Sequence, residues 1–194
     1  MTVRLLPLIT LYALVVAGVF LPAFSLADER ERRTLSALTV SPARLSEVVT
    51  AKGILGFGLA MPMALVTLWI NRALTGQGPA LLVVLAVAGL LLVILGLLYG
   101  TISKDITGVF TLIKGTGFLL LAPTVFYLFP DWPQWIAKLF PTYWVVNPVY
   151  EVTVNHAGLG AVWEELLIGL GMAALLALAV TLTTRRLRER LAST

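Results

Sequence analysis

The sequence predicts an all-α polytopic membrane protein with about five transmembrane helices. The chain has 194 residues, of which 59% are hydrophobic and 12% are charged, against roughly a half and a quarter in an ordinary soluble domain. A soluble domain of this composition would expose large apolar patches that promote aggregation. The apolar residues also gather into long runs, and the basic residues lie mostly at the ends of these runs. The bilayer is therefore the expected solvent, and residues 1–194 are expected to form a single transmembrane domain.

Five apolar runs are long enough to cross about 30 Å of hydrocarbon at about 1.5 Å per residue. They comprise residues 5–27, 53–70, 80–102, 106–129 and 162–184. The first run is too long for the core of a signal peptide, and no small-residue cleavage site follows it, so we expect it to be retained. Within the third run, Gly96-x-x-x-Gly100 predicts close packing against another helix.

Lys and Arg residues are distributed unequally between the two sets of connections. Residues 28–52, the turn after the third run and the C-terminal tail together carry ten, whereas the alternate connections carry only Arg4, Arg72 and Lys138. Because cytoplasmic connections are enriched in Lys and Arg, we expect the first set in the cytoplasm. This predicts a multi-pass protein of the inner or plasma membrane with a cytoplasmic C-terminus and an outer N-terminus. The basic residues do not line one soluble face, so no nucleic-acid partner is expected.

Residues 28–52 combine charge with signals for two helices. Residues 29–38 predict a short helix with a charged start and an apolar patch at Leu35 and Leu38, which can lie along the membrane surface. Ser41 and Pro42 then provide the N-cap and the first position of a helix that leads into the second span. A push on the first helix would be transmitted to this span as rigid-body motion. The alternative is a solvated charged loop that only enforces topology.

The first part of the outer connection, residues 130–161, is rich in aromatic residues and proline. Trp132, Trp135 and Phe140 belong to one apolar stripe of a predicted short helix, for which Pro133 suits the first turn. A plain aromatic belt at the level of the lipid headgroups is the alternative.

A second short helix is predicted in the same connection. Asn147 suits its N-cap and Pro148 its first helical position, and Gly158 marks its end. Two short helices within one connection predict a re-entrant or interfacial hairpin, which is tolerated at membrane depth where protein covers its backbone.

The segment between the first two runs resembles the cytoplasmic coupling region of ABC-2 type permeases. The resemblance is carried by Glu29, Glu31, Thr34, Leu35, Leu38, Ser41 and Pro42, with Lys52 opening the next span. The glycine that usually precedes the threonine in that family is Arg33 here. The outer connection, with its aromatics and Asn147-Pro148 before the last span, is also similar to the family's re-entrant hairpin, so the resemblance covers essentially the whole chain.

The resemblance implies the permease subunit of an ATP-binding-cassette exporter that works by alternating access. Two permeases, as a homodimer or heterodimer, would each dock on a separate ABC ATPase subunit through a cytoplasmic coupling helix. The expected coupling residues are Glu29, Glu31, Arg33, Thr34, Leu35, Leu38, Ser41 and Pro42. The family's usual first helix has no counterpart here, so the sequence corresponds to its spans two to six.

ATP hydrolysis is expected in a partner subunit, and no catalytic activity is expected in this chain. The sequence has no Gly-x-x-x-x-Gly-Lys-Ser/Thr loop that would cradle phosphates, so ATP and Mg would be bound by the ATPase subunit. The spans contain no cluster of His, Asp, Glu or Ser at membrane depth, which argues against a membrane-embedded enzyme. No catalytic residue, cofactor or metal ligand is expected in the chain itself.

Lys114 is the basic residue that lies well inside a predicted span. It stands about 14 Å beyond Asp105 along a helix, where a charge costs about 3 kcal/mol if it faces lipid. One hypothesis is that Lys114, together with Thr111, lines a translocation cavity and meets an anionic substrate or lipid group. The other is that it pairs with a neighbouring carbonyl or Thr hydroxyl within the bundle.

The apolar spans with one buried lysine suit an amphiphilic or hydrophobic cargo such as a drug, a lipid or a lipid-linked molecule. The competing function is that of an accessory or structural membrane subunit without its own translocation pathway.

Overall fold

Every regular element in the described part of the chain is a helix. The computed structural model describes residues 2–32, 45–74, 78–129 and 132–192. The elements are α1 (Thr2–Val15), the π-helix η1 (Val16–Phe20), α2 (Leu21–Glu31), α3 (Leu45–Ile70), α4 (Gly78–Ile102), α5 (Ile106–Leu128), the 3₁₀-helix η3 (Gln134–Leu139), α6 (Tyr143–Thr153) and α7 (Leu159–Ala192). Five segments are long and apolar enough to cross a membrane. The predicted all-α class with five spans and an additional pair of short helices is confirmed.

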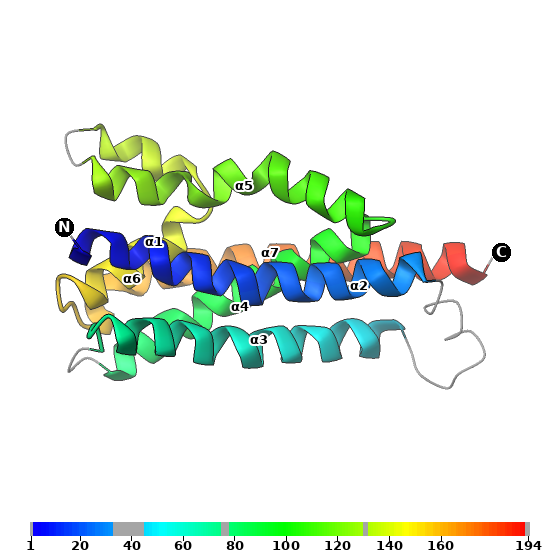
Figure 1. Ribbon diagram of the computed structural model, residues 1–194, viewed down its shortest axis with the longest axis horizontal. Coiled ribbons are helices and arrows are strands. Elements are labelled where there is room, and N and C mark those ends of the chain that lie inside the picture. Colours follow the sequence, from blue (N-terminus) through cyan, green and yellow to red (C-terminus); the bar gives the residue numbers. More distant parts are fainter. Residues whose placement is uncertain (1, 33–44, 75–77, 130–131, 193–194) are drawn as a thin grey trace.

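The long helices run side by side along one axis of the molecule (Figure 1). The continuous rod of α1, η1 and α2 packs on α3, α4 and α5, while α7 packs chiefly on α4. The central helix is α4, because 61% of its most apolar window is buried, against 17% in α7, 22% in α3 and 33% in α5. The three outer helices therefore present most of their surface to lipid or to another subunit.

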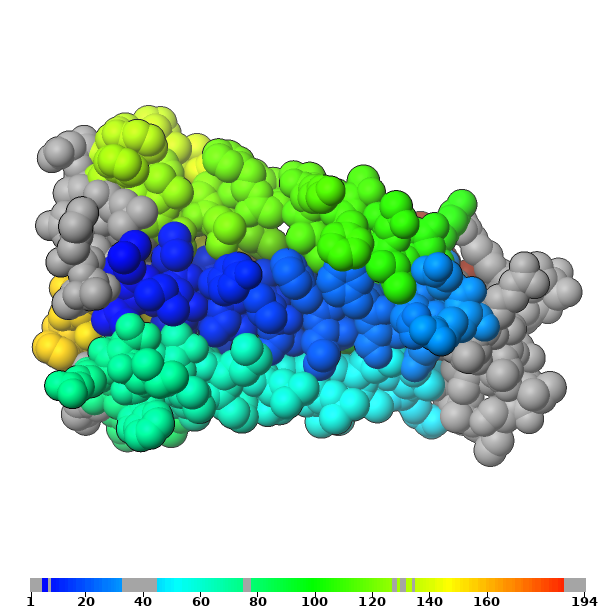
Figure 2. All heavy atoms as spheres, in the orientation of Figure 1, coloured from blue at the N-terminus to red at the C-terminus, as the bar shows by residue number. Residues whose placement is uncertain are grey.

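The face seen in Figure 2 consists of α5, the α1–η1–α2 rod and α3, lying next to one another. Large apolar side chains stand on the outside of these helices, including Ile54, Trp69 and Phe118, each more than 60% exposed. In water such a surface would drive aggregation, whereas in a bilayer it is the surface that faces the hydrocarbon.

The π-helix η1 lies directly before Pro22. A proline has no N–H to donate to the carbonyl four residues earlier, here that of Gly18, and a widened turn accommodates the break. The carbonyls of Gly18 and Val19 lie against Gly96 of α4, where an added Cβ would stand only 2.5 Å from the oxygen of Val19. At Gly100 an added Cβ would stand 2.8 Å from the side chain of Leu26. The close packing predicted for Gly96-x-x-x-Gly100 is thus confirmed, and its partner is η1 and α2.

The helix ends next to the Lys/Arg-rich segments lie at one end of the bundle. The end of α2, the start of α3, the α4–α5 turn and the end of α7 lie together at the right of Figure 1. The start of α1, the end of α3, the start of α4 and the short helices η3 and α6 lie toward the opposite end. The helix ends therefore fall into the same two groups that the distribution of Lys and Arg predicted.

The first span is longer than predicted, because α2 continues to Glu31. Glu29, which was expected to begin a separate surface helix, instead belongs to the last turn of α2. The remainder of that predicted helix, residues 33–38, lies outside the described residues, as do Ser41 and Pro42.

The start predicted for the second outer helix is wrong. The helix α6 begins at Tyr143, so Asn147 is not its N-cap and Pro148 lies inside it. The physical reason is burial: four valines of α6 (Val145, Val146, Val149 and Val152) are almost completely covered, and this apolar face extends the helix upstream of the proline. Asn147 instead donates through Nδ2 to Oε1 of Glu165 in α7, at 3.4 Å.

The first outer helix also differs from its prediction. η3 is a 3₁₀-helix that begins at Gln134, so Trp132 precedes it and Pro133 occupies its N-cap position. The predicted apolar stripe is not the buried side of this helix: Trp135 is exposed, and the buried residue is Ala137, which lies outside the stripe. Trp132 packs on the rings of Phe126 and Phe129 at the end of α5 instead.

Candidate functional site

The outward face of α5 carries the lysine of this helix together with two of its threonines. Thr107, Thr111, Lys114 and Phe118 are exposed and follow one another at spacings of three or four residues, which places them on one face of the helix. Thr111 satisfies its hydroxyl within the helix by donating to the carbonyl of Thr107 at 3.0 Å. We call this surface, residues 107, 110, 111, 114 and 118, the α5 face.

Lys114 lies on this face about 12 Å along the helix from Ile106, at 1.5 Å per residue. Its side chain is exposed, and its ammonium group has neither a hydrogen bond nor an ion pair with any residue that the structure describes. The pairing within the bundle that was the second hypothesis for this lysine is therefore not found inside this chain. An uncompensated ammonium at this depth is costly in lipid, so the α5 face requires either water or another protein beside it.

Two phenylalanines flank the lysine on the α5 face. Phe110 and Phe118 stand four residues before and after Lys114, and both are at least 50% exposed. Phe110 also contacts the ring of Phe24 in α2, with ring centroids 4.7 Å apart. The α5 face thus combines a cation with aromatic rings on both sides of it.

A few polar contacts hold α5 against the bundle behind this face. The hydroxyls of Tyr99 in α4 and Thr116 in α5 are 2.6 Å apart. Near the other end, Pro123 cannot donate to the carbonyl of Leu119, and the hydroxyl of Thr142 donates to it at 3.1 Å instead. The residue before α6 therefore compensates the break that proline makes in α5.

The charged end of α2 is the second candidate region, because three successive residues each reach a different helix. Glu29 Oε1 lies 2.8 Å from Nζ of Lys52 in α3, whose ammonium also donates to the hydroxyl of Ser25. Glu31 Oε2 accepts a hydrogen bond from the backbone N–H of Ile106 at the start of α5, at 3.2 Å.

Arg30 makes the third of these connections. Its Nη1 donates to the carbonyl of Thr101 at 2.9 Å and also to the carbonyl of Ser103. These carbonyls lie at the C-terminal end of α4, where helical partners run out and where the helix dipole favours a cation. We call Glu29, Arg30 and Glu31 the α2 clasp, since together they tie the end of α2 to α3, α4 and α5.

Two further carboxylates make polar contacts at the same end of the molecule. Asp105 caps α5 by accepting from the backbone N–H of Gly108 at 2.6 Å. Asp28 lies 2.8 Å from Nε of Arg32 on the same helix end, and this contact raises the pKa of the Arg32 guanidinium above its usual range. Unlike the α2 clasp, the contact between Asp28 and Arg32 does not reach another helix.

Of the predicted coupling residues, the structure describes Glu29 and Glu31 and brings them together in the clasp. Those that lie outside the described residues are Arg33, Thr34, Leu35, Leu38, Ser41 and Pro42. Arg30 was not among the predicted coupling residues, because in the sequence it is one of many charges that set topology. An available signal was its position within a run of alternating charges at the end of an apolar span, where a cation can cap a neighbouring helix.

Five apolar helices, with an unpaired cation on an outward face of one of them, define a multi-pass membrane protein. Residues 2–182 match the family model described as "Fluoroquinolones export permease protein Rv2686c-like", and the chain belongs to this family. It is thus an export permease, which agrees with the transport role that the sequence predicted. No curated protein and no solved structure matches the chain.

Proposed function

We propose that this chain is the permease subunit of an ATP-binding-cassette exporter of the ABC-2 type, driven by a separate ATPase subunit. Membership of the export permease family supports the transport role. The absence of a phosphate-binding loop from the sequence supports a separate source of ATP hydrolysis. The Lys/Arg-rich end of the bundle is the cytoplasmic end in this proposal.

The observation that carries the proposal is the position of Lys114 on the outside of the single chain. A translocation pathway enclosed by one chain would hold its charged residue inside the bundle, but this lysine points away from it. The pathway is therefore proposed to form between the α5 face and a second permease subunit, identical or different. There the ammonium meets water or cargo and avoids the cost of facing hydrocarbon.

The chemistry of the α5 face suits an amphiphilic cargo with an anionic group. Phe110 and Phe118 offer aromatic contact, and Lys114 between them offers a charge-assisted hydrogen bond to a carboxylate. The family description names fluoroquinolones, which carry an aromatic ring system and a carboxylate. They are the first cargo to test, and alternating access of the α5 face is the proposed mechanism.

The α2 clasp is proposed to carry the motion from the ATPase to the pathway. Its carboxylates and guanidinium connect the end of α2 with the start of α5 and with α3 and α4. A displacement of the segment that follows α2 would then move these helices together as rigid bodies. The ATPase is accordingly proposed to dock on residues 29–42.

The test of the pathway is transport by Lys114 variants in vesicles reconstituted with the partner subunits. Lys114→Met is expected to lower fluoroquinolone transport about tenfold or more, because one charge-assisted hydrogen bond is lost, and Lys114→Arg is expected to retain part of it. Lys138→Met, which removes an exposed lysine of η3 outside the spans, is the matched control and should transport normally. Full transport by Lys114→Met would overturn the pathway and favour an accessory subunit.

A further inference from the structure

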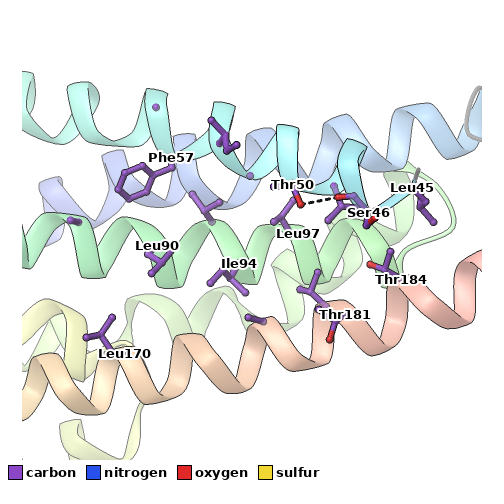
Figure 3. Close-up of a pocket in the computed structure, with 18 of the residues that line it drawn as sticks. Leu45, Ser46, Thr50, Phe57, Leu90, Ile94, Leu97, Leu170, Thr181 and Thr184 are labelled. Atoms are coloured by element: carbon purple, nitrogen blue, oxygen red, sulfur yellow. Dashed lines mark hydrogen bonds between the residues drawn. The ribbon is translucent and has the colours of Figure 1, made fainter. Parts of the chain in front are cut away.

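A long apolar groove runs between α3 and α7, with α4 as its floor (Figure 3). Its volume is about 1020 Å³, at the upper end of the range of roughly 300–1,000 Å³ for ligand pockets. No residue of α5 lines it, so it is separate from the α5 face. It exists because α3 and α7 both pack on α4 but scarcely touch each other.

The groove is apolar along most of its length and polar at one end. Phe57, Leu90 and Leu170 line the apolar part, whereas Thr184 and Arg185 line the other end. From Leu170 to Arg185 the groove follows α7 for about 22 Å at 1.5 Å per residue, which exceeds the roughly 15 Å of one hydrocarbon leaflet. An extended acyl chain can therefore lie along it over the whole depth of a leaflet.

The residues at the polar end of the groove suit the binding of an anionic group. None of the residues lining the groove is acidic, and Arg185 forms no ion pair within the part of the chain that the structure describes. Thr184 is 8% exposed, and its buried hydroxyl has no hydrogen-bond partner among the described residues. A buried hydroxyl without a partner is unfavourable, so an acceptor or donor brought by a ligand would compensate it.

We propose that this groove is a binding site for an anionic phospholipid of the cytoplasmic leaflet. The phosphate lies at Arg185 and Thr184, and one acyl chain follows α4 past Leu97 and Ile94 to the level of Leu90 and Phe57 (Figure 3). The polar end coincides with the end of the bundle where the Lys/Arg-rich connections meet, and the cytoplasmic leaflet is the one that carries anionic lipid. The choice of leaflet rests on the orientation given under the proposed function, whereas the preference for anionic lipid rests only on the groove.

The test is native mass spectrometry of the purified full-length chain in micelles that contain equal amounts of phosphatidylglycerol and phosphatidylcholine. The unmodified protein is expected to retain phosphatidylglycerol preferentially. Arg185→Gln should lower this retention about fivefold, the effect of one cation at a membrane surface. Arg186→Gln removes the neighbouring exposed cation, which does not line the groove, and should retain the lipid.

A second pair of variants tests the apolar part by filling it. Gly58 lines the groove, and an added Cβ there meets nothing within 4 Å, so a side chain can begin at this position and Gly58→Leu is expected to narrow the groove. Gly171→Leu is the control, because Gly171 is equally open but does not line the groove. Gly58→Leu is expected to release phosphatidylglycerol, and Gly171→Leu to keep it.

Four results would overturn the proposal. Equal binding of the two lipids, or equal losses in Arg185→Gln and Arg186→Gln, would mean that the groove does not select an anionic lipid. Unchanged lipid binding by Gly58→Leu together with weaker subunit association would assign the groove to a helix of another subunit. Loss of fluoroquinolone binding by Gly58→Leu, with unchanged lipid binding, would assign the groove to the cargo. The lipid-binding readouts do not depend on Lys114, so the lipid site and the transport pathway can fail independently.

Discussion

At Gly96 the backbones of α4 and η1 approach so closely that no side chain fits between them. The space that a Cβ would need is occupied by the backbone of Gly18 and Val19. Backbone atoms cannot rotate away as the end of a flexible side chain can, so the contact depends on glycine. In a bilayer, where apolar burial does not drive helix association, close backbone packing of this kind supplies much of the attraction.

Gly96→Ala is therefore expected to destabilise the fold by about 2 kcal/mol, since overpacking of a tight contact typically costs 1–3 kcal/mol. The measurement is the thermal midpoint of the purified protein in detergent. Gly117→Ala is the control, because a Cβ at Gly117 meets nothing within 4 Å, and it should leave the midpoint nearly unchanged. Equal thermal midpoints for the two variants would contradict the prediction, because α4 and η1 could then move apart to accommodate a Cβ at little cost.

Among the helices, α5 is attached to the rest of the bundle by a few specific contacts. Its start receives the carboxylate of Glu31 from α2, and its end receives the hydroxyl of Thr142 at the carbonyl that Pro123 leaves free. The helix that bears the proposed pathway is thus held at both ends by polar contacts to other elements. This arrangement suits a helix that moves as a unit when α2 moves.

The clasp predicts a variant that separates transport from ATP hydrolysis. Glu31→Ala removes the link from α2 to α5 and is expected to lower the amount of cargo moved per ATP several-fold, while the thermal midpoint changes little because the contact is exposed. Asp28→Ala is the matched control, since it removes a carboxylate whose ion pair stays within the end of α2. Equal coupling ratios for the two variants would exclude a transmitting role for Glu31.

The contact between Thr142 and Leu119 predicts a stability effect at the other end of α5. Thr142→Val leaves the Leu119 carbonyl without its donor and is expected to cost about 1–2 kcal/mol, measured again by the thermal midpoint. Thr67→Val removes a hydroxyl that bonds only to Met63 within its own helix and should be close to neutral. A neutral Thr142→Val would mean that the carbonyl finds another partner.

The two ends of the molecule differ in their content of Lys and Arg. The proposed orientation assigns each end to one side of the membrane. The chain contains no cysteine, so a single introduced thiol reports its own location. Asn155→Cys, at the end with η3 and α6, is expected to react with a membrane-impermeant maleimide on intact cells. Lys104→Cys, in the α4–α5 turn, is expected to react only after permeabilisation. The reverse pattern would invert the topology and remove the assignment of the ATPase-facing end.

Much of the architecture follows from the sequence alone. The five apolar runs and the placement of Lys and Arg are enough to predict five spans and the sharing of ends, because length, hydropathy and charge are local properties of each segment. The same holds for Gly96-x-x-x-Gly100 as a packing motif and for Lys114 as an intramembrane cation. Each of these signals can be read within a single segment of the sequence.

The tertiary structure decided the features that depend on neighbours. The direction in which Lys114 points, the three helices reached by the α2 clasp and the groove between α3 and α7 all require the relative placement of helices, which hydropathy does not encode. The start of α6 was predicted wrongly because burial against α4 and α7 outweighs the local preference of Asn147-Pro148 for a helix start. The sequence thus determined that the chain is a membrane protein with five spans, because the cost of each segment in lipid is local. Only the packing of the helices decided which faces remain exposed to cargo, lipid and partners, because a face stays exposed where no neighbouring helix covers it.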